Sequence, residues 1–475
     1  MKCKNCGFDN PKQAKFCIGC GTVLKNRKPK FWQVGLGICA VLLIGGISFL
    51  YLTGSINQVK TNQNHSKKTN KSDVSALVKE SLSYSSMRII PDSENSFVFI
   101  ADDGRLCSYD FKWGEFETKM YDIASISYAP YSYCAINRNG DLYTWGDNTF
   151  GNLGNGTAQE GSYESEPSQI MKNIEFASME LTCVAISKNK ELYLWGYCGN
   201  LEKGDESVPH GAGYYTPVLL KPRKILDDIV YASAGGKIGK GYNAAIASNG
   251  DLYMFGDEFY WDGSGEYTEQ WKPTKCMENI ISVDVGDGYF AAVTSENVLY
   301  TWGFNSRGRL GNGSEDTVYK PTKIMDNVAY CNLGEDVSYA ITTNGELYLW
   351  GCDSNQEVGM VVNSLTPKKV MDNVRFCTLS PYEDRVAVIT NDNTLYIWGS
   401  NNFGEIGNGT TENSKNPVKV MENVDAVALG EFGSAAITKK SELYVWGHDV
   451  ETETLDDGNT FDVDALSPVL IEVLI

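Results

Sequence analysis

Four cysteines at the start of the chain have the spacing of a metal site. Cys3 and Cys6 form one CxxC pair, and Cys17 and Cys20 form a second pair after ten intervening residues, in "CKNCGFDNPKQAKFCIGC". Two thiolates separated by two residues can bind one ion from a single tight turn, and a second such turn completes a closed tetrahedral site. We therefore expect a structural Zn(II) ion rather than a catalytic one. The alternative, two disulfide or redox pairs, is disfavoured because a redox CxxC normally occurs singly within a larger α/β domain.

The elements around this site indicate a membrane protein. Residues 1–24 resemble the small zinc-ribbon modules at the N-termini of many bacterial membrane proteins. Residues 31–54 carry no charge over 24 positions, which is long enough for a helix to cross a hydrocarbon core about 30 Å thick. We expect one transmembrane helix here, rather than a cleaved signal peptide or a buried core helix. The polar residues 55–73 predict a flexible linker.

Basic residues immediately before the predicted span indicate its orientation. Lys25, Arg27, Lys28 and Lys30 precede it, whereas the nearest basic residue after it is Lys60. This bias favours a cytoplasmic N-terminus, and thiolate zinc ligands also suit a reducing cytosol. The large C-terminal part is therefore predicted to lie outside the cell.

A repeated motif dominates that C-terminal part. Leu-Tyr-x-Trp-Gly occurs seven times, with Phe255 once in place of Trp, and successive copies start 47 to 60 residues apart. Each unit predicts two short strands joined by a tight turn, as in "YCAINRNGDLYTW", where Asn139 and Gly140 are expected to supply positive φ. A proline then precedes a last apolar strand. This spacing, with no helical periodicity, is typical of the blades of a β-propeller.

The motif resembles the regulator of chromosome condensation repeat family, because glycine loops such as "NSRGRLGNG" at 305–313 follow it. The resemblance covers about residues 124–475 and implies an all-β fold, a seven-bladed β-propeller of four-stranded blades. Three loops keep the full glycine pattern, "GNLGNG", "GRLGNG" and "GEIGNG", and the other four depart from it. In these loops we expect Gly and Asn to adopt positive φ and the single Leu or Ile to plug between blades. The repeated Trp and Tyr are expected to pack between blades rather than to bind a ligand.

Residues 74–123 contain a degenerate eighth repeat. Here "SFVFIADDGRLCSYD" aligns with "SYCAINRNGDLYTWG" at an offset of 36 residues. It could form a capping element, a ring-closing strand or a true eighth blade. We predict seven blades plus an accessory element.

Departures from the repeat are candidate binding surfaces, because loops are free to vary while blades are held by packing. The second unit has an insertion, and the third replaces its glycine loop with "EFYWDGSGEYTEQW". Exposed aromatic side chains among acids suit a protein, peptide or glycan ligand, although such rings can also pack a loop onto a blade edge. The candidate partner-binding residues are His210, Tyr214, Tyr215, Phe259, Tyr260, Trp261, Tyr267 and Trp271.

Charge and histidine content further limit the classes of function that fit this chain. Beyond residue 53 the chain has 33 basic and 59 acidic residues, hence a net charge of −26, and such a surface repels nucleic acid and anionic lipid. The whole chain has only three histidines, which lowers the case for a hydrolase. Propellers of the resembled family act as exchange factors for small GTPases, as chromatin binders and, in one bacterial branch, as β-lactamase inhibitors. A membrane span and an acidic propeller oppose the first two roles.

We therefore predict a non-enzymatic, membrane-anchored propeller that binds a protein, peptide or glycan partner outside the cell, with no nucleic acid partner. One alternative is an extracellular polysaccharide-acting enzyme, which would need acids and an aromatic floor gathered at the central funnel. The other alternative is a cytoplasmic scaffold in reversed topology.

Overall fold

The computed structural model describes residues 88–471, except 94–95, 111–113, 130, 198–205, 211–213, 238–239, 260–267, 335, 353–361, 381–383 and 455–459. The chain divides into two compact units, residues 1–42 and 43–475. The predicted zinc ligands, transmembrane segment and linker all lie outside the described residues. Within the described part, no helix combines the length and the apolar character needed to span a membrane. The same part contains no group of three or more His, Cys, Asp or Glu side chains placed to hold a metal ion.

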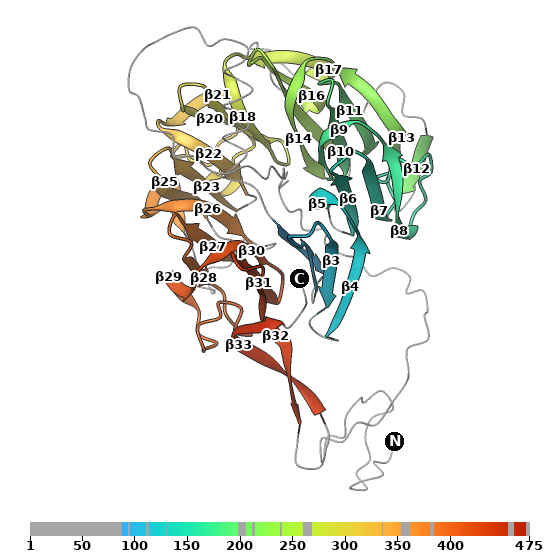
Figure 1. The fold of residues 1–475 in the computed structure, drawn as a ribbon. Coiled ribbons are helices and arrows are strands. Elements are labelled where there is room, and N and C mark those ends of the chain that lie inside the picture. Colours follow the sequence, from blue (N-terminus) through green and yellow to red (C-terminus); the bar gives the residue numbers. More distant parts are fainter. Residues whose placement is uncertain are drawn as a thin grey trace, which may run out of the picture. The chain divides into compact units, whose positions relative to one another are not determined.

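The described residues form eight antiparallel sheets, each built from consecutive strands, and these sheets are the blades of a β-propeller (Figure 1). Blade 1 contains β1 (Ile89–Ser93), β2 (Ser96–Ile100), β3 (Leu106–Asp110) and β4 (Glu115–Met120). Blade 2 contains β5 (Ile123–Ala129), β6 (Ser132–Asn137), β7 (Leu142–Asp147) and β8 (Tyr163–Met171). Blade 3 contains β9 (Ile174–Ser178), β10 (Thr182–Ser187), β11 (Leu192–Tyr197), β12 (Glu206–His210) and β13 (Tyr214–Leu226). Blade 4 contains β14 (Ile229–Lys237), β15 (Lys240–Ala247), β16 (Leu252–Phe259) and β17 (Thr268–Met277).

The second half of the ring repeats this pattern. Blade 5 contains β18 (Ile280–Val285), β19 (Tyr289–Thr294), β20 (Leu299–Gly303) and β21 (Val318–Met325), with a short 3-10 helix η1 (Ser306–Gly308) before β21. Blade 6 contains β22 (Val328–Leu333), β23 (Val337–Thr342), β24 (Leu347–Cys352) and β25 (Asn363–Met371). Blade 7 contains β26 (Val374–Leu379), β27 (Arg385–Thr390), β28 (Leu395–Gly399) and β29 (Ser414–Met421). Blade 8 contains β30 (Val424–Leu429), β31 (Gly433–Thr438), β32 (Leu443–Thr454) and β33 (Thr460–Ile471).

The predicted hairpin lies at the middle of each blade. In blade 2 Ile136 pairs with Leu142, and Ala135 lies opposite Tyr143, so the small residue makes room for the aromatic ring. The turn differs from the prediction, because Gly140 has a φ of 91° while Asn139 does not have positive φ. The amide of Gly140 donates to the carbonyl of Asn137 at 2.9 Å. One glycine therefore closes the turn without help from its asparagine neighbour.

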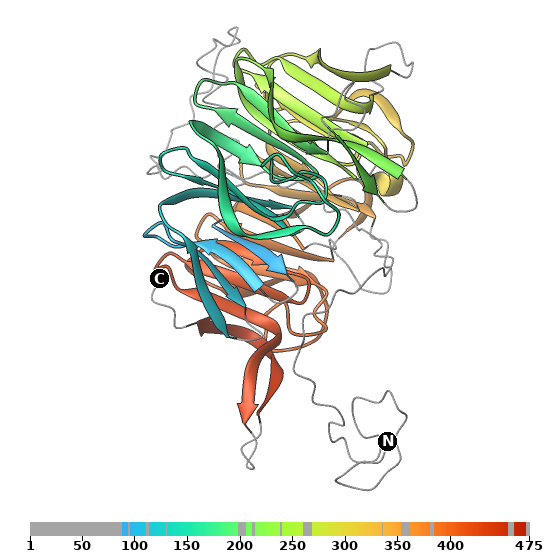
Figure 2. The same cartoon turned by 90° about the vertical axis from the view of Figure 1, so that its right-hand side faces the viewer.

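The degenerate repeat is a complete blade, so the prediction of seven blades plus an accessory element is wrong. Phe97 and Phe99 of blade 1 are buried in one cluster with Ala428, Ala435 and Val445 of blade 8. Figures 1 and 2 show the blue strands of blade 1 beside the red strands of blade 8. Because both faces of blade 1 are apolar, it is stable only between two neighbours, and this requirement closes the ring at eight blades.

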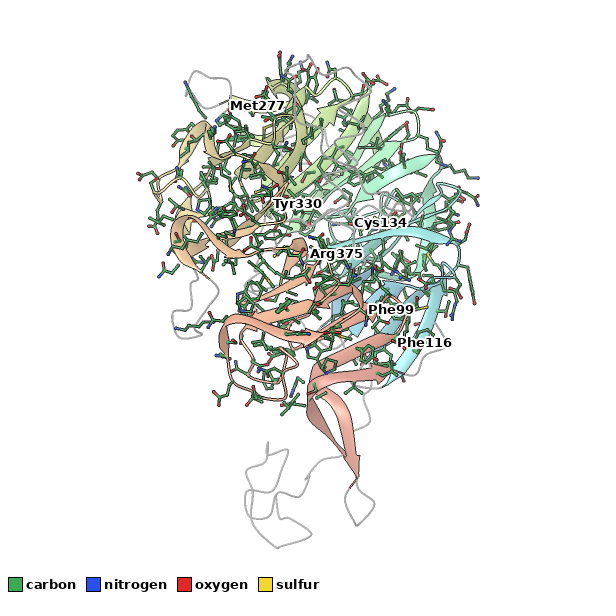
Figure 3. The ribbon with its side chains drawn as sticks, turned by 60° about the vertical axis from the view of Figure 1, so that its left-hand side comes forward. Phe99, Phe116, Cys134, Met277, Tyr330 and Arg375 are labelled. Atoms are coloured by element: carbon green, nitrogen blue, oxygen red, sulfur yellow. The ribbon has the colours of Figure 1, made fainter. Side chains whose placement is uncertain are left out.

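An ionic contact supplements this closure. Arg88 lies 3.3 Å from the carboxylate of Asp425 in blade 8, and it also pairs with Asp102. The Ser441 hydroxyl of blade 8 donates to Asp102. Phe99 and Phe116, whose ring centroids lie 6.2 Å apart, are labelled in blade 1 in Figure 3. Polar and apolar contacts therefore both join the first blade to the last.

The first strand of each blade is its innermost strand, and polar groups on these strands face the middle of the ring. Tyr330 on β22 and Arg375 on β26 are labelled in this region in Figure 3. Asp284 on β18 accepts a 2.8 Å hydrogen bond from the amide of Leu333. Burial raises the pKa of Asp284 to about 7, and burial together with the charge of Asp284 raises the pKa of Glu180 well above its usual range.

Candidate functional site: a cleft between blades 1 and 2

The three full glycine loops fill the junctions that follow blades 2, 5 and 7. Their plug residues Leu153, Leu310 and Ile406 are at most 1% exposed, as predicted. Each plug amide donates to the side-chain oxygen of the first loop asparagine, for example Leu153 to Asn148 at 3.1 Å. The asparagines of these loops do not have positive φ, whereas Gly151, Gly154 and Gly156 do. The prediction for the asparagines is therefore wrong, because their side chains hold the loop while the glycines turn it.

Each of these loops is received by the tryptophan of the next blade. Trp195 Nε1 donates to the carbonyl of Asn152 at 2.7 Å, Trp350 Nε1 to that of Arg309 at 2.7 Å, and Trp446 Nε1 to that of Glu405 at 2.8 Å. A loop glycine amide also donates to a leucine carbonyl on the outer strand of that blade. These pairs are Gly156 with Leu220, Gly313 with Leu365 and Gly409 with Leu466.

A small side chain twelve positions before the tryptophan completes each receiving site. Cys183 Sγ donates to Asn152, Ser338 Oγ to Arg309 and Ser434 Oγ to Glu405, in each case to the same loop carbonyl that the tryptophan binds. The corresponding residues in blades that follow other loops are Tyr133, Asn243, Phe290 and Val386. A cysteine or serine at this position thus marks a junction that receives a full loop.

The junction between blades 1 and 2 has no such loop. Residues 111–114 connect β3 to β4, whereas residues 148–162 connect the matching strands of blade 2. A cavity of about 570 Å³ opens here. It is lined by Asp92, Ser96, Val98, Ser108, Asp110, Glu115, Phe116, Glu117, Lys119, Tyr133, Trp145, Tyr163 and Ser165. We call this cavity the blade 1–2 cleft.

The positions of its lining residues match those of a loop site, and among the described residues no loop fills it. Trp145 occupies the position in blade 2 that Trp195 has in blade 3. Trp145 pairs with Tyr133 and Trp195 pairs with Cys183, in each case a residue twelve positions earlier in the adjoining strand. In blade 2 Gly146 pairs with Glu164, and Ser165 is the next residue of the chain. In blade 3 Gly196 pairs with Leu219, and Leu220 is the next residue. Ser165 therefore stands where a leucine receives the loop of the preceding blade elsewhere.

Two stacked aromatic rings form the floor of the cleft. The rings of Tyr133 and Trp145 have centroids 5.4 Å apart and planes inclined by 15°. The Tyr133 hydroxyl donates to the Asp92 carboxylate, which also accepts a 2.9 Å hydrogen bond from Ser96. Burial, and secondly the Asp92 charge, raise the pKa of Tyr133 far above its usual value, so this hydroxyl stays protonated.

The wall of the cleft is acidic. Asp110 lies opposite Glu115 in the β3–β4 register, and Ser108 lies opposite Glu117, so these side chains share one face of blade 1. Lys119 also lines the cleft, and its Nζ lies 2.5 Å from Glu117. Among the described lining residues, four carboxylates thus stand against one lysine that is already paired. The cleft is suited to a positively charged ligand with a flat, apolar surface.

The structure describes the backbone at five of the eight predicted binding residues, and these five lie in blades 3 and 4. His210 pairs with Tyr214, and Pro209 with Tyr215, so the backbone of the blade 3 insertion forms the β12–β13 hairpin at the outer edge of its sheet. Phe259 ends β16 and Trp271 lies in β17, while Tyr260, Trp261 and Tyr267 lie outside the described residues. The role of these candidates in partner binding stays a prediction.

One sequence signal pointed to the cleft. The degenerate repeat aligns with the next repeat at an offset of 36 residues, whereas all other successive repeats start 47 to 60 residues apart. The missing residues are those of the glycine loop between β3 and β4. The sequence alone does not show the consequence, because only the folded ring gives the degenerate repeat a neighbouring blade on each side.

Comparison with known proteins agrees with this architecture. The sequence model of the regulator of chromosome condensation (RCC1) repeat matches residues 139–183, 296–341 and 392–437, and a second RCC1 repeat model matches 123–152. The three longer matches each run from the central hairpin of one blade, through a full glycine loop, into the next blade. These repeats are of the RCC1 type. Together with the eight blades they support assignment of the propeller to the RCC1 family.

Individual RCC1-type relatives match part of the chain. The human E3 ubiquitin-protein ligase HERC2 is 27% identical over 195 residues, which cover 38% of this chain and 4% of that protein. The ultraviolet-B receptor UVR8 of Arabidopsis thaliana is 26% identical over 207 residues, which cover 41% of this chain and 44% of the receptor. The crystal structure of human WBSCR16 is 18% identical and has a TM-score of 0.50 over 66% of this chain and 86% of its own. This last likeness concerns the fold alone.

Proposed function

We propose that this chain is a membrane-anchored, non-enzymatic RCC1-type propeller that binds a protein partner outside the cell through the blade 1–2 cleft. The observation that carries the proposal is the unfilled loop site in front of Trp145. Three equivalent sites are filled by loops of the chain itself. An open site of this kind leaves a concave, partly aromatic surface, which is the usual form of a recognition site.

The surface of the cleft supports a protein partner over a purely structural role. Tyr163 is 60% exposed at the cleft, so its ring is accessible to a partner. Aromatic side chains contribute much of the energy of protein interfaces, and a rim of charges adds selectivity. The cleft combines both features.

Partner capture in cells tests this proposal. A photo-crosslinking amino acid placed at Tyr163 in the full chain is expected to capture a discrete partner protein, whereas the same group at Tyr319, which is 46% exposed on blade 5, is not. Capture lost in a Trp145→Ala, Glu115→Gln variant would assign the contact to the cleft. Equal capture from both positions would contradict the proposal.

The topology belongs to the same proposal. Its support is the uncharged stretch 31–54 with basic residues before it. Protease added to intact cells is expected to remove a tag placed at the C-terminus and to leave a tag at the N-terminus. Protection of the C-terminal tag would instead support a cytoplasmic scaffold in reversed topology.

A structural zinc ion completes the proposal for the N-terminal segment. Its support is the spacing of Cys3, Cys6, Cys17 and Cys20. The purified full chain is expected to contain one equivalent of zinc by elemental analysis. Substitution of Cys3 and Cys6 by serine should abolish zinc binding, whereas substitution of Cys107 and Cys134 should not.

A second candidate function is a polysaccharide-acting enzyme. The specific observation in its favour is that the carboxylates of Asp110 and Glu115 share the cleft with Tyr133 and Trp145. This cleft lies between two blades rather than at the central funnel, where such an enzyme was expected. Release of reducing ends from cell-surface glycans by the full chain, lost in Glu115→Gln, would establish the enzyme and overturn the non-enzymatic proposal.

A further inference from the structure

We propose that the blade 1–2 cleft binds an arginine-bearing turn of the partner protein, in the way that the junction between blades 5 and 6 holds Arg309. This inference rests on the proposed function and adds the chemistry of the partner. The partner turn would take the place of the glycine loop that blade 1 lacks.

The arginine of blade 5 provides the template. Its carbonyl accepts hydrogen bonds from Trp350 Nε1 at 2.7 Å and from Ser338 Oγ at 3.0 Å. Its guanidinium carbon lies 4.4 Å from the centroid of the Tyr289 ring, and Nη2 donates to Ser306 Oγ at 2.7 Å. A single arginine thus accepts from a tryptophan of the next blade with its backbone carbonyl, while its side chain packs on an aromatic face of its own blade.

The indole of Trp145 lines the cleft with its N–H donor available to an acceptor. Among the described residues its Nε1 donates no hydrogen bond. A partner backbone carbonyl can accept from this Nε1, as the carbonyl of Arg309 does from Trp350. The site therefore favours a peptide segment over a free organic cation.

The acidic wall selects the side chain of that segment. In blade 2 the Thr144 hydroxyl donates to the carbonyl of the plug residue Leu153 at 2.7 Å. Ser108 occupies the same position in blade 1 that Thr144 has in blade 2. Around Ser108, however, the cleft carries Asp110 and Glu115. An aliphatic plug would remove these carboxylates from water without compensation, whereas a guanidinium can bind a carboxylate through two hydrogen bonds.

The shape of the cleft favours arginine over lysine. Tyr133 and Trp145 are stacked, nearly parallel rings in the lining of the cleft, and the cleft lies between the sheets of blades 1 and 2. A planar guanidinium can lie against such rings while its edge donates to carboxylates, but an ammonium group is a strongly hydrated point charge. The cleft is therefore expected to discriminate between the two cations.

Selection from a random twelve-residue peptide library displayed on phage, with the purified full chain as bait, tests the inference. Parallel selections use the Asp110→Asn, Glu115→Gln variant and a control, Glu315→Gln, Asp316→Asn. The control removes two exposed acids next to the filled junction after blade 5. Peptides recovered by the wild type and the control but not by the cleft variant are expected to be enriched in arginine. For one such peptide, fluorescence anisotropy should show about tenfold weaker binding when arginine is replaced by citrulline, and clearly weaker binding when it is replaced by lysine.

A second variant tests the backbone contact. Trp145→Phe removes the indole donor while keeping an aromatic floor, and it should weaken binding about five- to tenfold with an unchanged circular dichroism spectrum. Cleft-dependent peptides without arginine, or with lysine equally effective, would overturn the inference and leave the proposed function standing. If no recovered peptide depends on Asp110 and Glu115, the proposed function fails together with the inference.

Discussion

Trp195 Nε1 donates a 2.7 Å hydrogen bond to the main-chain carbonyl of Asn152, which belongs to the glycine loop of the preceding blade. The same contact joins Trp350 to Arg309 and Trp446 to Glu405. Each of these three glycine loops is therefore a clamp between two blades. Because a clamp occupies its own junction, ligand binding is favoured at a junction that lacks one.

Glycine substitutions test the clamp. An added Cβ at Gly154 would lie 2.8 Å from Trp195 Cδ1, and Gly154 has a φ of 62°. We expect Gly154→Ala to destabilise the propeller by several kcal/mol, because backbone strain and a clash with a buried ring add together. Thermal unfolding followed by circular dichroism measures the effect.

Gly161 in the same connection is the matched control. Its φ is 69°, but an added Cβ would meet no atom within 4 Å. Gly161→Ala should therefore cost only about 1–2 kcal/mol, the strain of the left-handed conformation. Equal losses in the two variants would show that close packing of the loop on Trp195 does not contribute.

The repeat made most of the fold predictable. Strand pairing, turn position and the plug role of Leu153 follow from period-two burial and from the spacing of glycines, which are local signals. The role of Asn148 was not predictable in detail, since its side-chain hydrogen bonds depend on the folded loop. Blade 1 was not predicted to be a blade, because it has neither the Trp nor the glycine loop that defines the repeat. Its place in the ring depends on contacts between residues more than 300 positions apart, such as Arg88 and Asp425.

Closure of the ring by blade 1 leads to a second prediction. Phe97 is 1% exposed between blades 1 and 8, and its ring lies 3.5 Å from where a Cβ would stand at Gly430. Phe97→Ala should destabilise the propeller by about 3–5 kcal/mol through the cavity that it leaves. Tyr121→Ala, at a residue that is 71% exposed, is the control and should change the unfolding temperature little. If blade 1 were a dispensable appendage, both variants would unfold at the wild-type temperature.

The carboxyl of Asp284 predicts a pH dependence. Burial raises its pKa from an ordinary 3.8 to about 7, although the amides of Leu333 and Val285 partly oppose this shift. The folded state therefore holds this proton more tightly than the unfolded state does. Its stabilising contribution is complete below pH 4 and is lost as the pH rises towards 7.

The variant Asp284→Asn removes this titration and keeps an oxygen to accept from Leu333. Its unfolding temperature relative to wild type should rise between pH 4 and pH 7 and then stay constant, measured by calorimetry at each pH. Among the described residues, the titratable side chains that interact with Asp284 are Glu180, Tyr330, Cys331 and Tyr339, and none of their pKa values is lowered by it. A difference independent of pH would show that Asp284 is not protonated in the folded protein. Asp316→Asn, at an exposed acid of blade 5, is the control.

The propeller cysteines give the last prediction, which concerns the proposed extracellular location of the propeller. Cys107, Cys134, Cys183, Cys331 and Cys377 are buried, and none of the described cysteines forms a disulfide. Burial raises the pKa of Cys134 to about 12, so almost no reactive thiolate is present at pH 8. Cys352 is only partly buried. Among the cysteines that the structure describes, brief treatment of the folded chain with iodoacetamide should therefore modify Cys352 before the five buried thiols, which should react only in denaturant. Peptide mass spectrometry measures the extent at each site, and rapid modification of Cys134 in the native chain would show that the blades open on that timescale. Protected thiols are compatible with an oxidising exterior, since a thiol must be accessible before it can be oxidised.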